Sequence, residues 1–279
     1  MPKTLIQLAH SPDSDDAFMF YALARNKIDS GEFEFKHVLA DIQTLNEAAK
    51  RGTYEVSAIS MHAYPEVADR YALLTSGASM GDNYGPMVIA REPYGPEVIK
   101  EKTIAIPGLL TTAFLALKIF EPQIHYSVMP FDQILPAVDA GEVDLGLIIH
   151  EGQLTFAQSG LKCILDLGVW WREKTGGLPL PLGGNVVRKD LGKEKCRQLN
   201  QILRDSIVYS LEHRPEALDY ALSFARDMDP KLADKFVGMY VNELTVDYGE
   251  RGRKAVVRLF EEAVAKKLIP NMPELEFVE

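Results

Sequence analysis

Residues 146–156 read G-L-I-I-H-E-G-Q-L-T-F, an apolar run followed at once by a histidine and a glutamate. The run from Gly146 to Ile149 is apolar and has the length of a strand, which is typical of a strand buried inside a sheet. His150 and Glu151 follow at once, although titratable groups are costly to bury without partners. Either the strand reaches the surface here, or the two side chains belong to a polar site at its end.

Short apolar runs alternate with amphipathic helical patterns along the chain, which predicts an α/β protein with mainly parallel strands. Strands are predicted over residues 4–8, 33–38, 56–61, 87–90, 103–106, 124–128 and 143–149. Helices are predicted over residues 17–26, 42–51, 63–68, 112–120, 131–140 and almost continuously over 193–268.

Two segments interrupt this alternation and suggest that the chain crosses between two lobes. A-R-E-P-Y-G-P-E-V at 90–98 contains two prolines and a glycine, and a second crossing is predicted near L-P-L-G-G-N-V-V-R-K-D-L-G at 180–192. The predicted first lobe therefore combines residues 1–92 with 190–279, and residues 93–189 form an inserted second lobe. We expect a central ligand cleft between the lobes, at the carboxyl ends of the strands, with hinge motion at the crossings.

Composition narrows the class of protein. Of the 279 residues, 47% are hydrophobic and 25% charged, as in ordinary globular proteins, and the net charge of -10 argues against a nucleic-acid or anionic-membrane partner. No apolar run approaches the ~18 residues of a membrane span. The two cysteines lie far apart without metal-binding spacing, so we expect free thiols and a cytoplasmic location. No sequence pattern indicates whether the protein is a monomer or an oligomer.

Polar side chains follow four of the predicted strands. Ser11 to Asp16 follow the first strand, Ser60 the third, Thr111 and Thr112 the strand at 103–106, and His150 the last. Hydroxyl residues at a helix start are natural N-caps, which is one interpretation of each of these residues. The functional alternative is that helix N-termini offer N–H groups and positive dipole to a substrate carboxylate.

Other kinds of site are not indicated. The six histidines lack HxxxH or HxH spacing, which argues against a metal centre, and the D-S-D-D run at 13–16 is better explained by capping and dipole pairing than by cation binding. Neither a GxGxxG nor a Walker-type loop occurs, so no nucleotide cofactor is expected. A GxSxG elbow is absent as well.

Four longer stretches resemble the 1,4-dihydroxy-6-naphthoate synthase family of menaquinone biosynthesis, in the same order and nearly end to end. They are G-L-I-I-H-E-G-Q-L-T-F, P-G-L-L-T-T-A-F at 107–114, D-L-G-V-W-W-R-E-K-T-G-G-L-P-L-P-L-G-G at 166–184 and Y-V-N-E-L-T-V-D-Y-G-E-R-G-R-K-A-V at 240–256. The resemblance implies the type II periplasmic-binding-protein fold. It also implies the cofactor-independent cleavage of cyclic dehypoxanthine futalosine to 1,4-dihydroxy-6-naphthoate and dihydroxyacetone.

The resemblance also implies particular site residues. The family's general base falls on His150, and its substrate-contacting segments fall on two triplets, Ala58, Ile59 and Ser60, and Thr111, Thr112 and Ala113. Ser11 and Asp16, from the loop after the first strand, complete the expected substrate-binding set. The expected partner is a small-molecule carboxylate.

Two departures leave the substrate open. The family typically reads S-P-C-P-N-D-T-F where this chain reads S-P-D-S-D-D-A-F at 11–18, and it commonly has a lysine at the position of Ala58. Both changes make the expected cleft more acidic. The alternatives are a non-catalytic small-anion or solute-binding protein of the same fold, and a chorismate dehydratase-like relative. His10, Glu151 and Asp15 remain further candidates for a catalytic part.

Overall fold

The structure, a computed structural model, describes residues 3–224 and 229–279, and the chain divides into two compact units. The first unit is Met1–Ser79, Gly183–Glu250 and Pro273–Glu279, and the second is Met80–Leu182 and Arg251–Met272. This division differs from the predicted lobes, 1–92 with 190–279 and 93–189, because residues 251–272 pack with residues 80–182. The segment 90–98, predicted as a crossing, lies inside the second unit.

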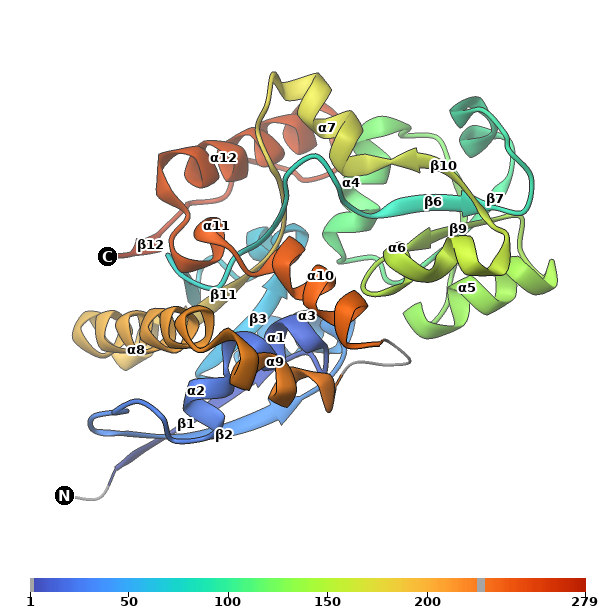
Figure 1. Cartoon of the computed structure of the whole chain (residues 1–279). Coiled ribbons are helices and arrows are strands. Elements are labelled where there is room, and N and C mark those ends of the chain that lie inside the picture. The colour runs from blue at the N-terminus through green and yellow to red at the C-terminus, as the bar shows by residue number, and fades with distance from the viewer. Residues whose placement is uncertain (1–2, 225–228) are drawn as a thin grey trace. The chain divides into compact units, whose positions relative to one another are not determined.

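The first sheet has the order β12-β4-β11-β3-β1-β2, with β5 beside β11 (Figure 1). Its strands are β1 (Thr4–His10), β2 (Phe33–Leu39), β3 (Val56–Ser60), β4 (Tyr71–Leu74), β5 (Ser79–Gly81), β11 (Leu180–Arg188) and β12 (Phe277–Val278). β1 runs parallel to β2 and β3, whereas β11 is antiparallel to β3 and β4. The sheet is therefore mixed.

The second sheet has the order β10-β6-β9-β7-β8. Its strands are β6 (Met87–Ala90), β7 (Thr103–Ile106), β8 (His125–Val128), β9 (Leu145–Ile148) and β10 (Lys162–Asp166). β7 is parallel to β8 and β9, and β6 is antiparallel to β9 and β10. This mixed α/β organisation has the predicted fold class.

Helices cover both sheets. In the first unit they are α1 (Ser14–Met19), α2 (Tyr21–Ala24), α3 (Ile42–Lys50), α8 (Lys193–Glu212), α9 (Arg214–Leu222), α10 (Pro230–Tyr240) and α11 (Glu243–Val246). In the second they are α4 (Thr112–Phe120), α5 (Phe131–Ala140), α6 (Gly152–Thr155), α7 (Leu167–Thr175) and almost all of α12 (Gly249–Ala265).

The two units repeat one β-α-β-α-β arrangement, although the sequence shows no repeat. In the first unit β1 lies between β2 and β3, and in the second β7 lies between β8 and β9. Successive crossovers therefore run in opposite directions, and right-handed crossovers place their helices on opposite faces of the sheet. The carboxyl ends of β1 and β3, and of β7 and β9, are the switch points where such sheets bind ligands.

The cores of the first unit agree with this arrangement. Ile6 and Leu8 of β1 pack in a large cluster with residues of α1, α2 and α8, whereas the alternate residue Ala9 packs with Leu45 of α3. The alternation of side chains along β1 thus buries both faces. His10, the last residue of β1, lies on the same face as Leu8.

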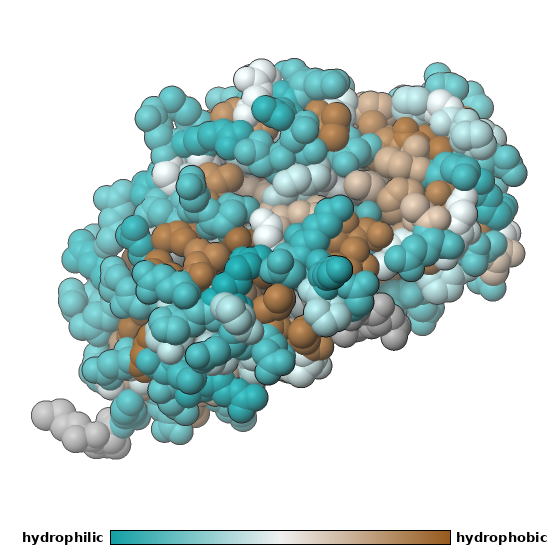
Figure 2. All heavy atoms as spheres, in the orientation of Figure 1, coloured by the Kyte–Doolittle hydropathy of each residue, from teal (hydrophilic) through white to brown (hydrophobic). Residues whose placement is uncertain are grey.

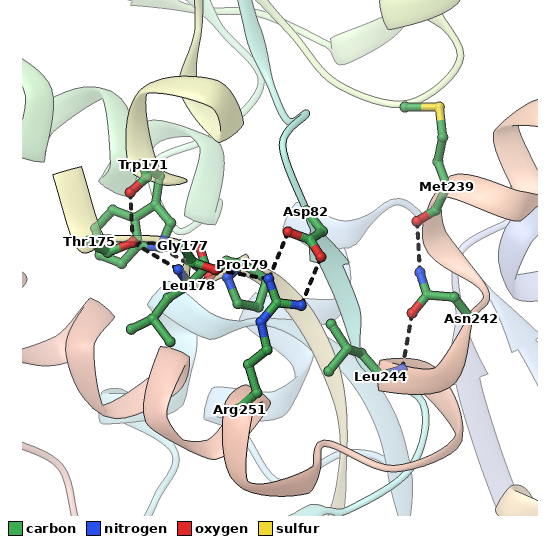
Figure 3. A network of polar contacts seen from close by, with 10 residues as sticks. All are labelled: Asp82, Trp171, Thr175, Gly177, Leu178, Pro179, Met239, Asn242, Leu244 and Arg251. Atoms are coloured by element: carbon green, nitrogen blue, oxygen red, sulfur yellow. Dashed lines mark hydrogen bonds and ion pairs between the residues drawn. The ribbon is translucent and has the colours of Figure 1, made fainter. Parts of the chain in front are cut away.

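The motif at 240–256 contributes to stability within the second unit through Arg251. Its guanidinium donates two hydrogen bonds to the Asp82 carboxylate, at 2.7 and 2.8 Å, and a third to the Gly177 carbonyl at 2.8 Å (Figure 3). Arg251 holds the pKa of the Asp82 carboxyl below its ordinary value. These contacts explain why α12, far along the chain, belongs to this unit.

Two other motif residues, Gly184 and Tyr248, lie in close contact in the first unit. A Cβ at Gly184 would lie 2.3 Å from Tyr248 Oη, which is buried without a hydrogen-bond partner among the described residues. We expect Gly184→Ala to lower the free energy of unfolding by about 1–3 kcal/mol through overpacking. Tyr248→Phe should be neutral or stabilising because it removes an unpaired buried hydroxyl.

The double variant gives the decisive comparison in urea denaturation. Gly184→Ala should lower the free energy of unfolding by less in the Tyr248→Phe background than in the wild type. Some loss should remain, because the new Cβ would also lie 2.5 Å from Met61 Cε. An unchanged cost in both backgrounds would show that the phenol is not what excludes a side chain at position 184.

Candidate functional site

The predicted site residues collect at the switch point of each unit. In the first unit, Ser11 and Asp16 follow β1, and Ser60 ends β3. In the second unit, Thr111 and Thr112 lie at the start of α4, after β7, and His150 follows β9. Each set therefore lies where its own sheet favours ligand binding.

His150 has a left-handed backbone conformation with φ of 58°. This conformation costs a non-glycine residue roughly 1–2 kcal/mol, and such residues cluster at functional sites. The imidazole is half-buried and packs against the Phe131 ring, with 4.7 Å between centroids. Glu151, the next residue, is 7% exposed and immediately precedes α6.

Close packing beneath β9 positions the strand that carries His150. A Cβ at Gly146 would lie 2.7 Å from methyl groups of both Ile134 and Val138 on α5. Only glycine allows the helix to approach the strand this closely. The glycine in the motif at 146–156 is thus explained by packing.

The start of α4 combines a cap and a fixed hydroxyl. Thr111 Oγ1 accepts a hydrogen bond from Phe114 N at 3.3 Å and donates to Gly108 O at 2.8 Å, so the capping alternative holds for this residue. The Thr112 hydroxyl donates to Leu182 O at 2.5 Å. What this helix start can offer an anion is therefore its first-turn N–H groups, including that of the buried Ala113.

The loop after β1 is held together by its own carboxylates. Ser11 N donates to Asp16 Oδ2 at 2.7 Å, and Ser11 Oγ donates to Asp13 Oδ2, also at 2.7 Å. Ser11 and Asp16 were predicted as substrate contacts, and this structure shows them bonded to each other. Asp13, which the site prediction did not include, is a third member of this loop network.

The third polar group of Ser11, its carbonyl oxygen, is bound by His10, which is in turn bonded to His37. His10 Nδ1 lies 2.9 Å from Ser11 O, and His10 Nε2 lies 2.9 Å from His37 Nδ1. A carbonyl oxygen only accepts, so His10 Nδ1 carries the proton and His10 Nε2 accepts from His37. The last acceptor in this series of hydrogen bonds is His37 Nε2, which is buried without a partner among the described residues.

The three residues at the end of β3 that were predicted as substrate contacts are all buried. Ala58 packs with Ala9 and Leu45, and Ile59 is fully buried, so both side chains belong to the core. Ser60 is 4% exposed and is bonded twice to Asn46 of α3. The sequence contained a signal for Asn46: Ile42, Leu45 and Ala49 form the apolar stripe of this helix, and position 46 lies within it.

The tryptophan motif at 166–184 is largely structural. Asp166 caps α7 through the N–H groups of Gly168 and Val169, and a Cβ at Gly168 would lie 1.9 Å from Tyr84 O. Trp171 is fully buried and donates to Pro179 O at 3.0 Å, so this side chain belongs to the core (Figure 3).

The described residues contain no group of three or more histidine, cysteine, aspartate or glutamate side chains placed to hold a metal ion. Within residues 3–224 and 229–279, no helix has the length and apolar character to cross a bilayer. Hydrophilic residues cover most of the face shown in Figure 2, and apolar residues gather there in small groups.

The buried histidine pair makes stability depend on pH. Burial lowers the pKa of His10 to about 4, and burial together with His10 lowers the pKa of His37 to about 4. Between pH 6.5 and 4 the unfolded chain therefore binds protons that the folded chain does not. The contribution of the two histidines to the free energy of unfolding is therefore fully present above pH 6.5 and is lost as the pH falls. The loss is about 2–4 kcal/mol for the pair, after allowing for the exposure of His37.

Thermal unfolding at several pH values between 4.5 and 7.5 tests this prediction. His37→Asn keeps an N–H donor for His10 but removes one titrating group, so it should lose a substantial part of this pH dependence. His125→Asn is the matched control, because His125 is exposed on β8. Equal pH slopes in wild type and His37→Asn would contradict the assignment.

Comparison with known proteins identifies relatives along nearly the whole chain. A family model described as menaquinone biosynthesis matches residues 6–265. The 1,4-dihydroxy-6-naphthoate synthase of Thermus thermophilus is 40% identical over 98% of this chain and 99% of its own length. The synthase of Streptomyces coelicolor is 36% identical over 98% of this chain and 97% of its own.

Solved structures agree. A protein of Archaeoglobus fulgidus superposes with a TM-score of 0.91 at 46% identity, covering 95% of this chain and 98% of that one. A Candida albicans protein with the generic periplasmic-binding-protein fold superposes with a TM-score of 0.73 at 11% identity, covering 98% and 93%, and shows the fold alone. The family model and the curated relatives together show that this chain belongs to the menaquinone-biosynthesis family.

Proposed function

We propose that this protein is a 1,4-dihydroxy-6-naphthoate synthase that cleaves cyclic dehypoxanthine futalosine, with loss of dihydroxyacetone and without a cofactor. The names of the curated relatives support this reaction. The acid–base step is assigned to His150, and substrate contacts to residues at or after the carboxyl ends of β1, β3 and β7. We place the reaction in the cytoplasm, as expected from the two free cysteines.

The observation that carries the proposal is the position and backbone of His150. The residue follows β9 at the switch point of its sheet, in a left-handed conformation that a histidine adopts at an energetic cost. Cleavage of the substrate requires removal of a proton from carbon or hydroxyl. An imidazole, with an ordinary pKa near 6.5, is suited to accept it at neutral pH.

His10 is the rival base, and its contacts argue against it. Both of its ring nitrogens are engaged, since Nδ1 donates to Ser11 O and Nε2 accepts from His37. In this arrangement no lone pair on His10 is available for a substrate proton. Its role in the proposal is to hold the loop after β1.

The substrate carboxylate is assigned to the start of α4. The hydroxyls of Thr111 and Thr112 are engaged as donors to Gly108 O and Leu182 O. The N–H groups of Thr112 and Ala113, at the positive end of the helix dipole, are the groups proposed to bind the carboxylate.

Turnover of cyclic dehypoxanthine futalosine by the purified protein, followed through naphthoate absorbance, tests the function. His150→Ala should lower kcat by about 10²–10⁴, the usual contribution of a positioned general base, while leaving substrate binding in place. His10→Ala is the comparison and should retain far more activity. The base would be reassigned if His10→Ala abolished turnover and His150→Ala did not.

Two other functions have distinct outcomes in the same assay. A solute-binding protein, favoured only by the fold, would bind the compound without converting it. A chorismate dehydratase-like relative, suggested by the departures at Ser11 to Asp16 and at Ala58, would convert chorismate instead.

A further inference from the structure

Asn46 holds Ser60 at two points. Ser60 N donates to Asn46 Oδ1 at 2.8 Å, and Asn46 Nδ2 donates to Ser60 Oγ at 3.1 Å. Asn46 is fully buried on α3, and Ser60 is 4% exposed at the carboxyl end of β3. One helix side chain thus binds both the backbone and the hydroxyl of one strand-end residue.

The directions of these two bonds follow from chemistry alone. The Ser60 backbone N–H can only donate, so the atom of the Asn46 amide that faces it is the oxygen. The amide nitrogen therefore faces Ser60 Oγ, which must accept. The hydroxyl proton of Ser60 cannot point back at Asn46, and it donates to no described residue.

We infer that Asn46 is a positioning residue for substrate binding, which orients the Ser60 hydroxyl as a donor toward an anionic or carbonyl oxygen of the substrate. The inference rests on the proposed function, in which Ser60 contacts the substrate. It adds a residue on α3 that acts through Ser60 without touching substrate. A buried amide fixes the donor before the substrate arrives, so that no hydroxyl rotor has to be ordered on binding.

A purely structural role is the alternative, because the same pair of bonds also ties α3 to β3. The chain contains a second instance at a residue that is not among the proposed substrate contacts, where the asparagine also bonds to Ser76 Oγ and Val278 O. Asn200 of α8 accepts from Thr75 N at 3.0 Å and donates to Thr75 Oγ1 at 2.8 Å. Thr75 follows β4, which lies two strands from β3 in the sheet. Asn200 is therefore a matched control for the loss of such a tie.

The decisive substitution is Asn46→Asp, which keeps the acceptor for Ser60 N–H but removes the donor to Ser60 Oγ. The Ser60 hydroxyl then donates to the new carboxylate and is withdrawn from the substrate. Binding of cyclic dehypoxanthine futalosine should weaken by roughly ten- to a hundredfold, the usual effect of losing one hydrogen bond to a charged group. Ser60→Ala should weaken it to a similar degree.

The double variant separates positioning from other effects. If Asn46 acts through Ser60, Asn46→Asp should change affinity little once Ser60→Ala is present. Charge repulsion from the new carboxylate, or a loosened α3, would persist in that background. Asn200→Asp should lower the melting temperature and leave KM near the wild-type value.

Each outcome is decisive. Loss of affinity in both single variants without further loss in the double variant supports the inference. Losses of affinity that add up in the double variant overturn the inference, and so does a KM in Asn200→Asp raised as much as in Asn46→Asp. In either case, turnover by the wild-type protein leaves the proposed function standing. A wild-type protein that neither binds nor converts the compound overturns the proposed function, and this inference with it.

Discussion

The right-handed crossover between parallel strands is the constraint on which the candidate site depends. In each unit the middle strand, β1 or β7, has neighbours reached by crossovers in opposite directions. Helices must then lie on opposite faces, and the segments that follow the strands gather at the carboxyl end of the middle strand. Polar residues that would be costly in a core are tolerated there, because the strand has ended and helix N–H groups are nearby.

Local patterns were sufficient for the elements that build these crossovers. The apolar runs at β1, β2, β7 and β9 and the helical periods of α3, α4 and α5 predicted their ranges closely. The sequence patterns do not predict the strands β4, β5, β10, β11 and β12, whose pairing partners lie far away in the chain. The segment that holds β11 is predicted as a crossing, and the boundary between the two units does fall within it, between Leu182 and Gly183. That the segment is also a strand does not show in the pattern, because two glycines and a proline resemble a loop unless the close approach of the Tyr248 phenol is known.

The same limit applies to the candidate site. Sequence could indicate which residues follow each strand, but not which of their polar groups are already bonded. Ser11 illustrates the difference: its N–H, hydroxyl and carbonyl are held by Asp16, Asp13 and His10. These partners lie only one, two and five residues away in the chain, yet the conformation of the folded loop decides which of them Ser11 meets. A residue type alone therefore does not show whether a donor remains available.

Ser60 and His150 occupy equivalent places, each at the carboxyl end of the third strand of the repeated β-α-β-α-β arrangement. In the first unit the side chain is oriented by a buried amide on the preceding helix. In the second, the backbone itself is held left-handed, and the imidazole rests on Phe131. A hydroxyl needs an orienting partner because its proton rotates, whereas the lone pair of an imidazole lies in the ring plane and its direction is fixed by the ring position and the tautomer. The repeated topology therefore supplies the location, and the chemistry of each side chain decides what must hold it there.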